Sequence, residues 1–206
     1  MRFGDYARKC SIAILNNVVS AKLSNISSSI TAKPPTDDTT SKDIPTTYYS
    51  TVTVTTTVTP RVLLQINLFG GPGGDFFDDV EHNNNIVGIV GMRIHAGDEA
   101  VNSIQVTYHL RDGSNYTAPM HGQTGDTEYS FTLADGEKLT RMEGEFNQGI
   151  STGVIDSLTF YSNMNNAYGP YGTTDQIQFS FTATEFVAFF GRAGHLIDAI
   201  GVYYIN

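Results

Sequence analysis

One short phrase occurs three times in the sequence, and this repeat limits the fold more than any other feature. The phrase has a branched aliphatic residue, Asp or Asn, a small residue, an aliphatic residue and an apolar residue two positions later. It reads VNSIQV at residues 101–106, IDSLTF at 155–160 and IDAIGV at 197–202. One such unit cannot bury its apolar face alone, so three copies predict one shared core with pseudo-threefold symmetry.

The segments before each phrase repeat as well. A short segment that ends in glycine precedes each copy, at Gly91, Gly144 and Gly191. Further upstream lie three glycine-rich turns, which read FGGPGGDFF, MHGQTGDTEYSF and YGPYGTTDQIQFSF. We therefore expect three four-stranded units that form a three-sheet prism or a related barrel.

The chain beyond residue 61 has the composition of β-structure. Short runs rich in β-branched and aromatic residues alternate with turn sequences such as RDGSN, ADGE and NMNNAYGPYG, and no run has a helical pattern. Only 16% of all residues are charged, whereas the chain has 20 Gly, 11 Tyr and 12 Phe. Both observations predict an all-β domain at residues 61–206.

The first 60 residues differ in character. Residues 24–59 are dominated by Ser, Thr and Pro, which predicts a poorly ordered extension or linker over residues 1–60. Within it, Thr and Val alternate, and Val52, Val54 and Val58 share one face of an edge strand or a stiff extended tether. A membrane-inserting hairpin is the alternative, but no second matching strand follows.

Charge and cysteine content exclude several classes of function. The net charge of -9 argues against nucleic acid, heparin-like polymers and anionic membranes as partners. The single cysteine, Cys10, excludes an internal disulfide framework. No apolar run approaches the roughly 18 residues of a membrane span. The N-terminus has some features of a secretory signal, but Asp5 and two asparagines interrupt it, which favours the cytoplasm over secretion.

Three phrases of the domain resemble the signatures of jacalin-related lectins. These are GGPGGDFFDD at residues 70–79, YGPYGTTDQIQFSF at 168–181 and FFGRAGHLIDAIGVYY at 189–204. The resemblance covers residues 61–206 in the right order. It implies a β-prism I fold of three Greek-key sheets that binds a sugar at one apex, without cofactor or catalysis. It also implies a homo-oligomer whose partners are glycans or glycoproteins.

The last phrase contains the residue types that sugar recognition needs. A carboxylate accepts protons from two sugar hydroxyls, and backbone N–H groups held in a glycine loop donate to sugar oxygens at little entropic cost. Gly194, His195, Leu196 and Asp198 supply this combination, and the resemblance adds Gly74 from the neighbouring loop. The alternative is purely structural, with Gly194 serving a tight turn and Asp198 capping its own loop.

The resemblance also bears on the type of sugar and on a second site. In the family, galactose preference accompanies cleavage that turns the pocket glycine into a new N-terminus, and Gly74 lies in an uninterrupted loop. Terminal mannose or glucose is therefore expected. A weaker second site is expected at Asp98, Asn102 and Gly122, where Asn replaces the acid. Asp156, the third equivalent, is expected to stabilise a turn.

A rival interpretation makes the domain a protein-interaction or toxin-targeting module with a vestigial sugar pocket. The two interpretations differ in whether Asp198 faces an open notch formed with Gly74 or is buried and bonded to its own loop. Aromatic stacking on a sugar is a further option for three tyrosines in turn regions, which can equally belong to the core or its rim: Tyr129, Tyr168 and Tyr171.

Other chemistry lacks support in the sequence. The five histidines are scattered and have no cysteine partners, so no metal site is expected. A glycosidase needs two carboxylates across a cleft, and nothing favours pairing Asp198 with Asp75. The acidic cluster after the glycine turn lacks calcium-loop spacing and is expected to be solvated or to cap a turn. Its members are Asp75, Asp78, Asp79 and Glu81.

Overall fold

The computed structural model describes residues 62–147, 153–174 and 176–206. The expected extension at residues 1–60, its edge strand and the signal-like N-terminus lie outside the described residues. Within the described ranges, no helix is long and apolar enough to cross a membrane.

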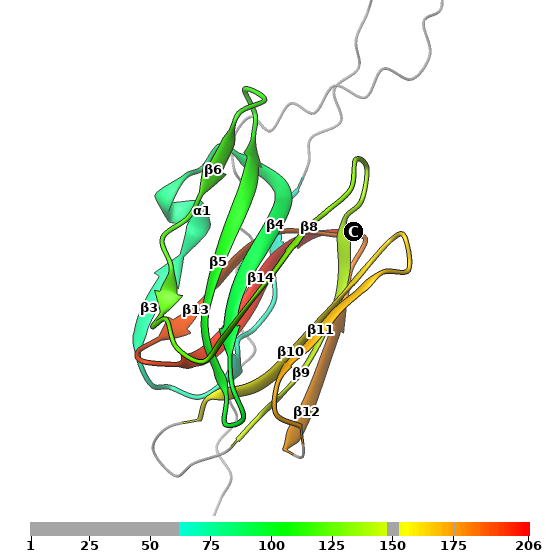
Figure 1. The fold of residues 1–206 in the computed structure, drawn as a ribbon. Coiled ribbons are helices and arrows are strands. Elements are labelled where there is room, and N and C mark those ends of the chain that lie inside the picture. Colours follow the sequence, from blue (N-terminus) through cyan, green and yellow to red (C-terminus); the bar gives the residue numbers. More distant parts are fainter. Residues whose placement is uncertain (1–61, 148–152, 175) are drawn as a thin grey trace, which may run out of the picture. The chain divides into compact units, whose positions relative to one another are not determined.

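The described residues form three antiparallel sheets, as the repeat predicts (Figure 1). Sheet I has the order β1-β14-β13-β3 with β2 beside β14, sheet II has β6-β5-β4-β8 with β7 beside β5, and sheet III has β11-β10-β9-β12. The strands of sheet I are β1 (Leu64–Gln65), β2 (Phe69–Gly70), β3 (Asp75–Asp78), β13 (Glu185–Ala193) and β14 (Ile197–Ile205). Those of sheet II are β4 (Ile86–Ala96), β5 (Val101–Leu110), β6 (Asn115–Thr117), β7 (His121–Gly122) and β8 (Thr127–Thr132). Those of sheet III are β9 (Leu139–Phe146), β10 (Ile155–Ser162), β11 (Ala167–Gly172) and β12 (Ile177–Thr182).

Strand register confirms the threefold repeat of the phrase. In each unit a glycine with positive φ lies opposite the small residue of the phrase. Asn102, Asp156 and Asp198 each precede that small residue and so occupy equivalent places. The three pairs are Gly70 with Ala199, Gly122 with Ser103 and Gly172 with Ser157.

The glycine that precedes each phrase is equivalent in only two of the three units. Gly144 and Gly191 lie opposite the same position of the phrase, and a Cβ at either would come within 2.4 Å of a backbone oxygen. In sheet II that position holds Ile94, three residues beyond Gly91. The expected equivalence of Gly91 with Gly144 and Gly191 is therefore wrong. Strand register places Ile94, and not Gly91, at the position that these two glycines occupy.

The core lies where the three phrases meet. The second aliphatic residue of each phrase, Ile104, Leu158 or Ile200, has no solvent exposure. Aromatic rings link the sheets across this core, with Phe160 of β10 edge-on to Phe189 of β13 at 5.8 Å. Burial of each such side chain stabilises the fold by about 1.5–3 kcal/mol, so the units are stable only together.

Two local features differ from expectation. The segment NMNNAYGPYG, expected as a turn, contains strand β11. This strand lies at the edge of sheet III, where Pro170 can be accommodated although it lacks an N–H group. One short helix, α1 (Asp79–His82), also forms where none is expected, because the Asp78 carboxylate accepts hydrogen bonds from the N–H groups of Val80 and Glu81.

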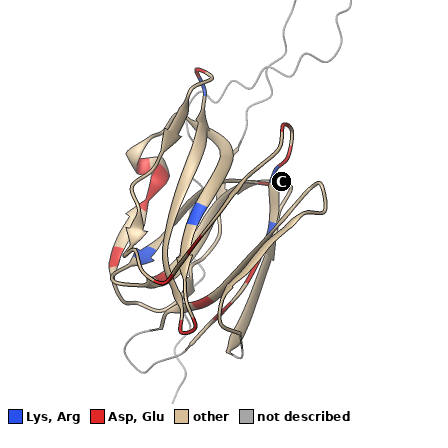
Figure 2. Cartoon of the chain, viewed as in Figure 1, with Lys and Arg blue, Asp and Glu red and all other residues tan. Residues whose placement is uncertain are grey.

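Charged residues are sparse on these sheets. Figure 2 shows acidic residues in α1 and at several strand ends, with the Lys and Arg residues on separate strands and loops.

Candidate functional site

Two loops of sheet I meet at one notch. The loop between β13 and β14 carries Gly194, His195 and Leu196, and the loop between β2 and β3 carries Gly74. β3 pairs with β13, so that the residue after Gly74 lies opposite Ala193, next to Gly194. A Cβ at Gly194 would lie 3.6 Å from the Cα of Gly74, which places the two loops in direct contact.

Asp198 lies beneath the glycine loop. A Cβ added at Gly73 would come within 2.1 Å of its Oδ1 atom, and one at Gly74 within 2.4 Å of Oδ2. The φ angle of Gly74 is +59°, a conformation that residues with a side chain rarely adopt. The absence of side chains at both positions is therefore what lets the carboxylate approach this loop. From the sequence only Gly74 is expected in the site, although the GGPGG motif also contains Gly73.

The notch is open at its rim and closed at its base. Gly74, Gly194 and His195 are exposed and Leu196 is half-buried, whereas Asp198 retains 7% exposure. The structure thus brings together all five residues that were expected to form the site. It also buries the acid more deeply than an open notch requires.

Burial raises the pKa of the Asp198 carboxyl group. Two neighbours act in the opposite direction, namely the Gly194 N–H, which donates a hydrogen bond to the carboxylate, and the positive charge of Arg192. The pKa still lies above the usual value for Asp. These two contributions therefore do not fully offset the effect of burial on the ionised carboxylate. Further hydrogen bonds to the carboxylate would stabilise its ionised form.

Arg192 is a residue that the sequence analysis misses. Its Nε atom donates to the carbonyl oxygen of Gly73 at 2.7 Å, and its Nη2 atom donates to that of Gly74 at 2.6 Å. One guanidinium group thereby holds both peptide units of the loop above Asp198. The arginine lies within the GRAGH sequence, but no local pattern indicates that it reaches a loop more than a hundred positions earlier.

The equivalent place in sheet II has a different shape. Gly122 corresponds in register to Gly70, so the counterpart of Gly74, four residues further on, is Asp126, whose φ angle of +53° is nearly the same. Its carboxylate lies against Gly97, where a Cβ would come within 2.4 Å of Oδ2. Sheet II therefore has a residue with a carboxylate side chain at the place where sheet I has Gly74.

The remaining residues of the second notch do not compensate for this. Asn102 has its Oδ1 atom buried without a hydrogen-bond partner, and Asp98 is exposed. The backbone carbonyl of Asp98 accepts a hydrogen bond from the hydroxyl of Thr173. In sheet III, Asp156 is buried and accepts a hydrogen bond from Asn147 Nδ2 at 2.8 Å, in keeping with the expected role in its turn.

The loops of the three sheets contact one another in a ring. The N–H of Gln123, from sheet II, donates to the carbonyl oxygen of His195 at 3.2 Å and so supports the sheet I loop. The sheet III loop reaches sheet II through Thr173 and Asp98. The ring closes between sheets I and III, where Gly71 and Gly153 pack backbone against backbone.

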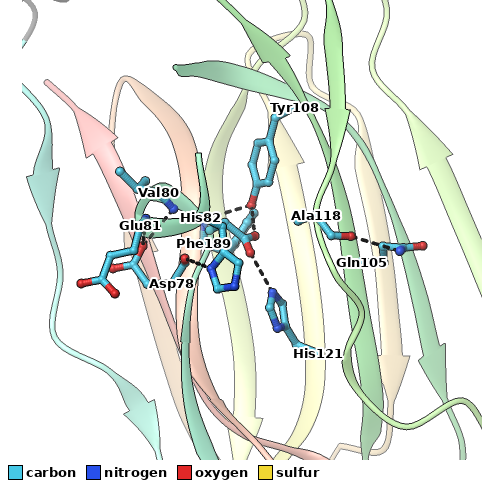
Figure 3. A network of polar contacts seen from close by, with 10 residues as sticks. Asp78, Val80, Glu81, His82, Gln105, Tyr108, Ala118, His121 and Phe189 are labelled. Atoms are coloured by element: carbon cyan, nitrogen blue, oxygen red, sulfur yellow. Dashed lines mark hydrogen bonds and ion pairs between the residues drawn. The ribbon is translucent and has the colours of Figure 1, made fainter. Parts of the chain in front are cut away.

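A buried polar network lies at the end of β3, the strand that follows the glycine loop (Figure 3). Asp79 has no solvent exposure, and its two oxygens are hydrogen-bonded with the Tyr108 hydroxyl at 2.5 Å and with His121 Nε2 at 2.7 Å. The Tyr108 hydroxyl also accepts a hydrogen bond from the backbone N–H of Phe189. The expectation that this acid is solvated is therefore wrong, because it links β5, β7 and β13.

The network stabilises the fold and does not take part in ligand chemistry. Burial, and then the Asp79 carboxylate, raise the pKa of Tyr108 well above its usual value, so its hydroxyl stays protonated and donates. Asp78 caps α1, as expected for this cluster, and also accepts a hydrogen bond from the Tyr203 hydroxyl at 2.6 Å. Together these bonds fix the strand that follows the Gly73–Gly74 loop.

The three tyrosines considered for sugar stacking lie elsewhere. Tyr129 of β8 and Tyr171 of β11 contact each other at 5.2 Å, and Tyr168 stacks on Phe131 at 4.1 Å. These rings form the junction of sheets II and III. Two surface depressions also lie away from the notch, one of about 630 Å³ on sheet III and one of about 810 Å³ beside α1.

Metal binding has no donor set in the described part of the chain. No three His, Cys, Asp or Glu side chains gather there in a way that could hold an ion. The chemistry of the notch is thus that of one carboxylate and a set of backbone amides.

The three sheets form a β-prism with one acidic notch bounded by glycine loops, and comparison with known proteins identifies the family. The jacalin-like lectin domain matches residues 66–203. The chain therefore belongs to the jacalin-like lectin family, a family of carbohydrate-binding proteins that are not enzymes.

Individual relatives support this assignment. An agglutinin of Castanea crenata is 34% identical over 66% of this chain and 44% of its own length. The jacalin-related lectin Calsepa of Calystegia sepium is 33% identical over 66% of this chain and 90% of its own length. The chain thus spans less than half of the first of these relatives and most of the second.

Solved structures agree with the fold. AcmJRL, a mannose-binding jacalin-related lectin from Ananas comosus, is 31% identical and superposes with a TM-score of 0.63 over 69% of this chain and 97% of its own. A mannose-specific jacalin-related lectin from Morus nigra, solved with mannose, is 31% identical with a TM-score of 0.62 over 75% of this chain and 100% of its own. Both neighbours place the described sheets in the β-prism class.

Proposed function

We propose that this lectin binds terminal mannose- or glucose-type sugars in the notch formed by Gly74, Gly194, His195, Leu196 and Asp198. The observation that carries the proposal is the position of Asp198, whose two carboxylate oxygens lie against Gly73 and Gly74 of the facing loop. A single acid enclosed by glycine backbone matches the donors and acceptors of a sugar edge.

The division of roles follows from hydrogen-bond chemistry. The Asp198 carboxylate accepts from two sugar hydroxyls, and charge-assisted bonds of this type are stronger than neutral ones. The N–H groups of Gly74, His195 and Leu196 donate to sugar oxygens. Because Gln123 and Arg192 already hold these loops, little additional ordering is needed when the sugar binds.

The preference for mannose or glucose has two supports. Gly74 lies in an uninterrupted loop, so its nitrogen is an amide N–H and not a free amine. Structural neighbours from Ananas comosus and Morus nigra are described as mannose-binding and mannose-specific. A galactose-type site is therefore disfavoured.

One working site per chain is proposed. In the sheet II notch Asp126 takes the place of Gly74 and its carboxylate lies against Gly97, and Asn102 provides no charge. A single shallow site gives weak affinity for a monosaccharide, about 1 mM or roughly 4 kcal/mol. Clustered glycans or a homo-oligomer of the lectin would raise the avidity.

The rival function, an interaction module with a vestigial pocket, has one observation in its favour. Asp198 is 7% exposed and accepts a hydrogen bond from Gly194 of its own loop. The Gly194 N–H also donates to the Leu196 carbonyl oxygen at 3.0 Å, which holds the loop in place for a ligand, and the exposed rim of Gly74 and His195 favours the sugar site.

A glycan array probed with the wild-type chain and with Asp198→Ala separates the two functions. The lectin proposal expects binding to mannose- or glucose-terminated glycans that disappears in the variant. A folded wild-type chain that binds no glycan would contradict it and favour the interaction module.

A further inference from the structure

We infer that Arg192 is a positioning residue for sugar recognition: it clamps the Gly73–Gly74 loop so that the Gly74 N–H faces the ligand. This inference rests on the proposed function of the notch and extends it to a residue that does not itself touch the sugar. It is carried by the two hydrogen bonds from one guanidinium group to consecutive carbonyl oxygens, at 2.7 and 2.6 Å.

Planarity of the peptide bond links these carbonyls to the donor. The carbonyl of Gly73 and the N–H of Gly74 belong to one trans peptide unit, in which they point in opposite directions. A guanidinium group that fixes the Gly73 carbonyl on one side of the loop therefore fixes the Gly74 N–H on the other side. The direction of this N–H is thus set by Arg192, and not by any contact of its own.

The loop needs such a restraint because of its composition. Gly73 and Gly74 have the widest conformational freedom of any residue type, and this freedom is what allows Asp198 to approach them. Without a restraint, sugar binding would have to order both peptide units, and affinity would fall accordingly. The clamp orders the loop before the ligand arrives.

Arginine suits this position better than lysine. Its planar fork offers Nε and Nη2 in fixed geometry to two acceptors, whereas an ammonium group cannot reach two carbonyls with the same alignment. The residue lies on β13, with Ala199 of β14 opposite on one side and Phe76 of β3 on the other. Its stem therefore starts from an inner strand of sheet I, which gives the fork a rigid base.

Arg192 also acts on Asp198 through its charge. Burial raises the pKa of Asp198, and the guanidinium counteracts part of that rise. The arginine therefore has two separable effects. One depends on the geometry of the fork and the other on the positive charge alone.

Two variants separate these effects. Arg192→Met removes both, and Arg192→Lys keeps the charge but not the fork. Calorimetric titration with methyl α-mannopyranoside between about pH 4 and pH 8 is expected to show affinity at least tenfold weaker in Arg192→Met, with the acidic midpoint of binding moved to higher pH. Arg192→Lys is expected to bind at intermediate strength with the wild-type midpoint.

Several results would overturn the inference. These are wild-type affinity in either folded variant, or equal losses in both variants without a shift of the midpoint in Arg192→Met. The second result would mark Arg192 as merely structural. Thermal unfolding measures whether each variant is folded. If Arg192→Met does not fold, the affinity of Arg192→Lys alone tests the inference.

The wild-type chain and Asp198→Asn keep the two claims apart. Wild-type binding that Asp198→Asn abolishes, together with unchanged binding by Arg192→Met, removes the positioning role and leaves the sugar site intact. Failure of the wild-type chain to bind the mannoside contradicts the proposed function itself.

Discussion

The carboxylate of Asp198 lies against backbone rather than against side chains, so the site depends on residues that have no side chain to offer. Gly73 and Gly74 have to be glycine, because a Cβ at either position would overlap the carboxylate of Asp198. Such a requirement is visible in the sequence only as a GGPGG motif. Its partner, the acid of the GHLID loop, lies far away in the chain.

Replacement of Gly74 by alanine tests this exclusion. The new Cβ would come within 2.4 Å of both Asp198 Oδ2 and the Ala193 carbonyl carbon, at a φ angle of +59°. We expect mannoside binding to be lost and the free energy of unfolding to fall by about 2–4 kcal/mol. Calorimetry and urea unfolding measure the two effects.

Gly113→Ala is the matched control for Gly74→Ala. Gly113 has a φ angle of +87°, but no atom lies within 4 Å of its Cβ position. It should lose only about 1 kcal/mol of stability, from the backbone conformation alone, and keep full sugar affinity. Equal losses in both variants would show that backbone strain, and not contact with Asp198, sets the requirement for glycine.

The ionisation of Asp198 gives opposite pH dependences for binding and for stability. Because its pKa is raised in the folded chain, mannoside affinity should begin to fall at a pH above the ordinary Asp range as the acid takes up its proton. The same raised pKa means that ionised Asp198 costs folding free energy, a cost that grows as pH rises through the folded pKa.

Asp198→Asn should therefore lose binding without losing stability at neutral pH. Its stability relative to wild type should improve from acidic to neutral pH, as measured by urea unfolding across that range. A variant that is clearly less stable at pH 7 than at pH 4, relative to wild type, would show that the carboxylate serves the fold. That outcome would support the interaction module over the sugar site.

At the scale of secondary-structure elements, the strand that follows the glycine loop is held by polar contacts from sheet II. The Asp79 carboxylate at its end is bonded to Tyr108 of β5 and His121 of β7, and Tyr108 in turn accepts the N–H of β13. The network thus connects the loop of the candidate site to the core of two sheets.

Tyr108→Phe should destabilise the fold strongly. Removal of the hydroxyl leaves one Asp79 oxygen and the Phe189 N–H buried without a partner, which should cost about 2–4 kcal/mol. Tyr161→Phe is the control, because its hydroxyl bonds Glu143 on a half-exposed face and should cost about 1 kcal/mol or less. Chemical denaturation measures both, and similar losses would contradict a structural role for the network.

The strands were largely predictable from the sequence, whereas the exceptions depend on tertiary context. Alternating and continuous apolar runs identify β4, β5, β9, β10, β13 and β14 because these strands bury branched and aromatic residues. The Gly and Pro residues of β11 predict a turn, because a strand tolerates them only at a sheet edge and local sequence does not reveal which strand is at the edge. α1 is a single turn that depends on the Asp78 cap.

At the scale of the whole molecule, the pseudo-threefold repeat predicts the architecture but not which unit is functional. The phrase identifies Asn102, Asp156 and Asp198 as equivalent, and the register confirms it. Whether each notch is open depends on a residue of another loop, such as Gly74 or Asp126. Arg192 and the buried Asp79 network also escaped prediction, because their partners are distant in sequence.

A truncated chain of residues 61–206 should fold by itself. The strands that share the core begin at Leu64, and the family match covers residues 66–203. We expect one cooperative unfolding transition and the same mannoside affinity as the chain of 206 residues, measured by calorimetry. An aggregated or unfolded product would show that residues 1–60 contribute to the fold, which would contradict the predicted domain boundary.

The most direct test of the central claim is an amide NMR titration of the assigned chain with methyl α-mannopyranoside. We predict shifts that gather at Gly74, His195, Leu196 and Asp198 and follow a single saturation curve in the millimolar range. The sheet II residues Asn102 and Asp126 should remain unchanged. A folded chain without shifts at this notch, or with shifts centred on another surface, would contradict the account.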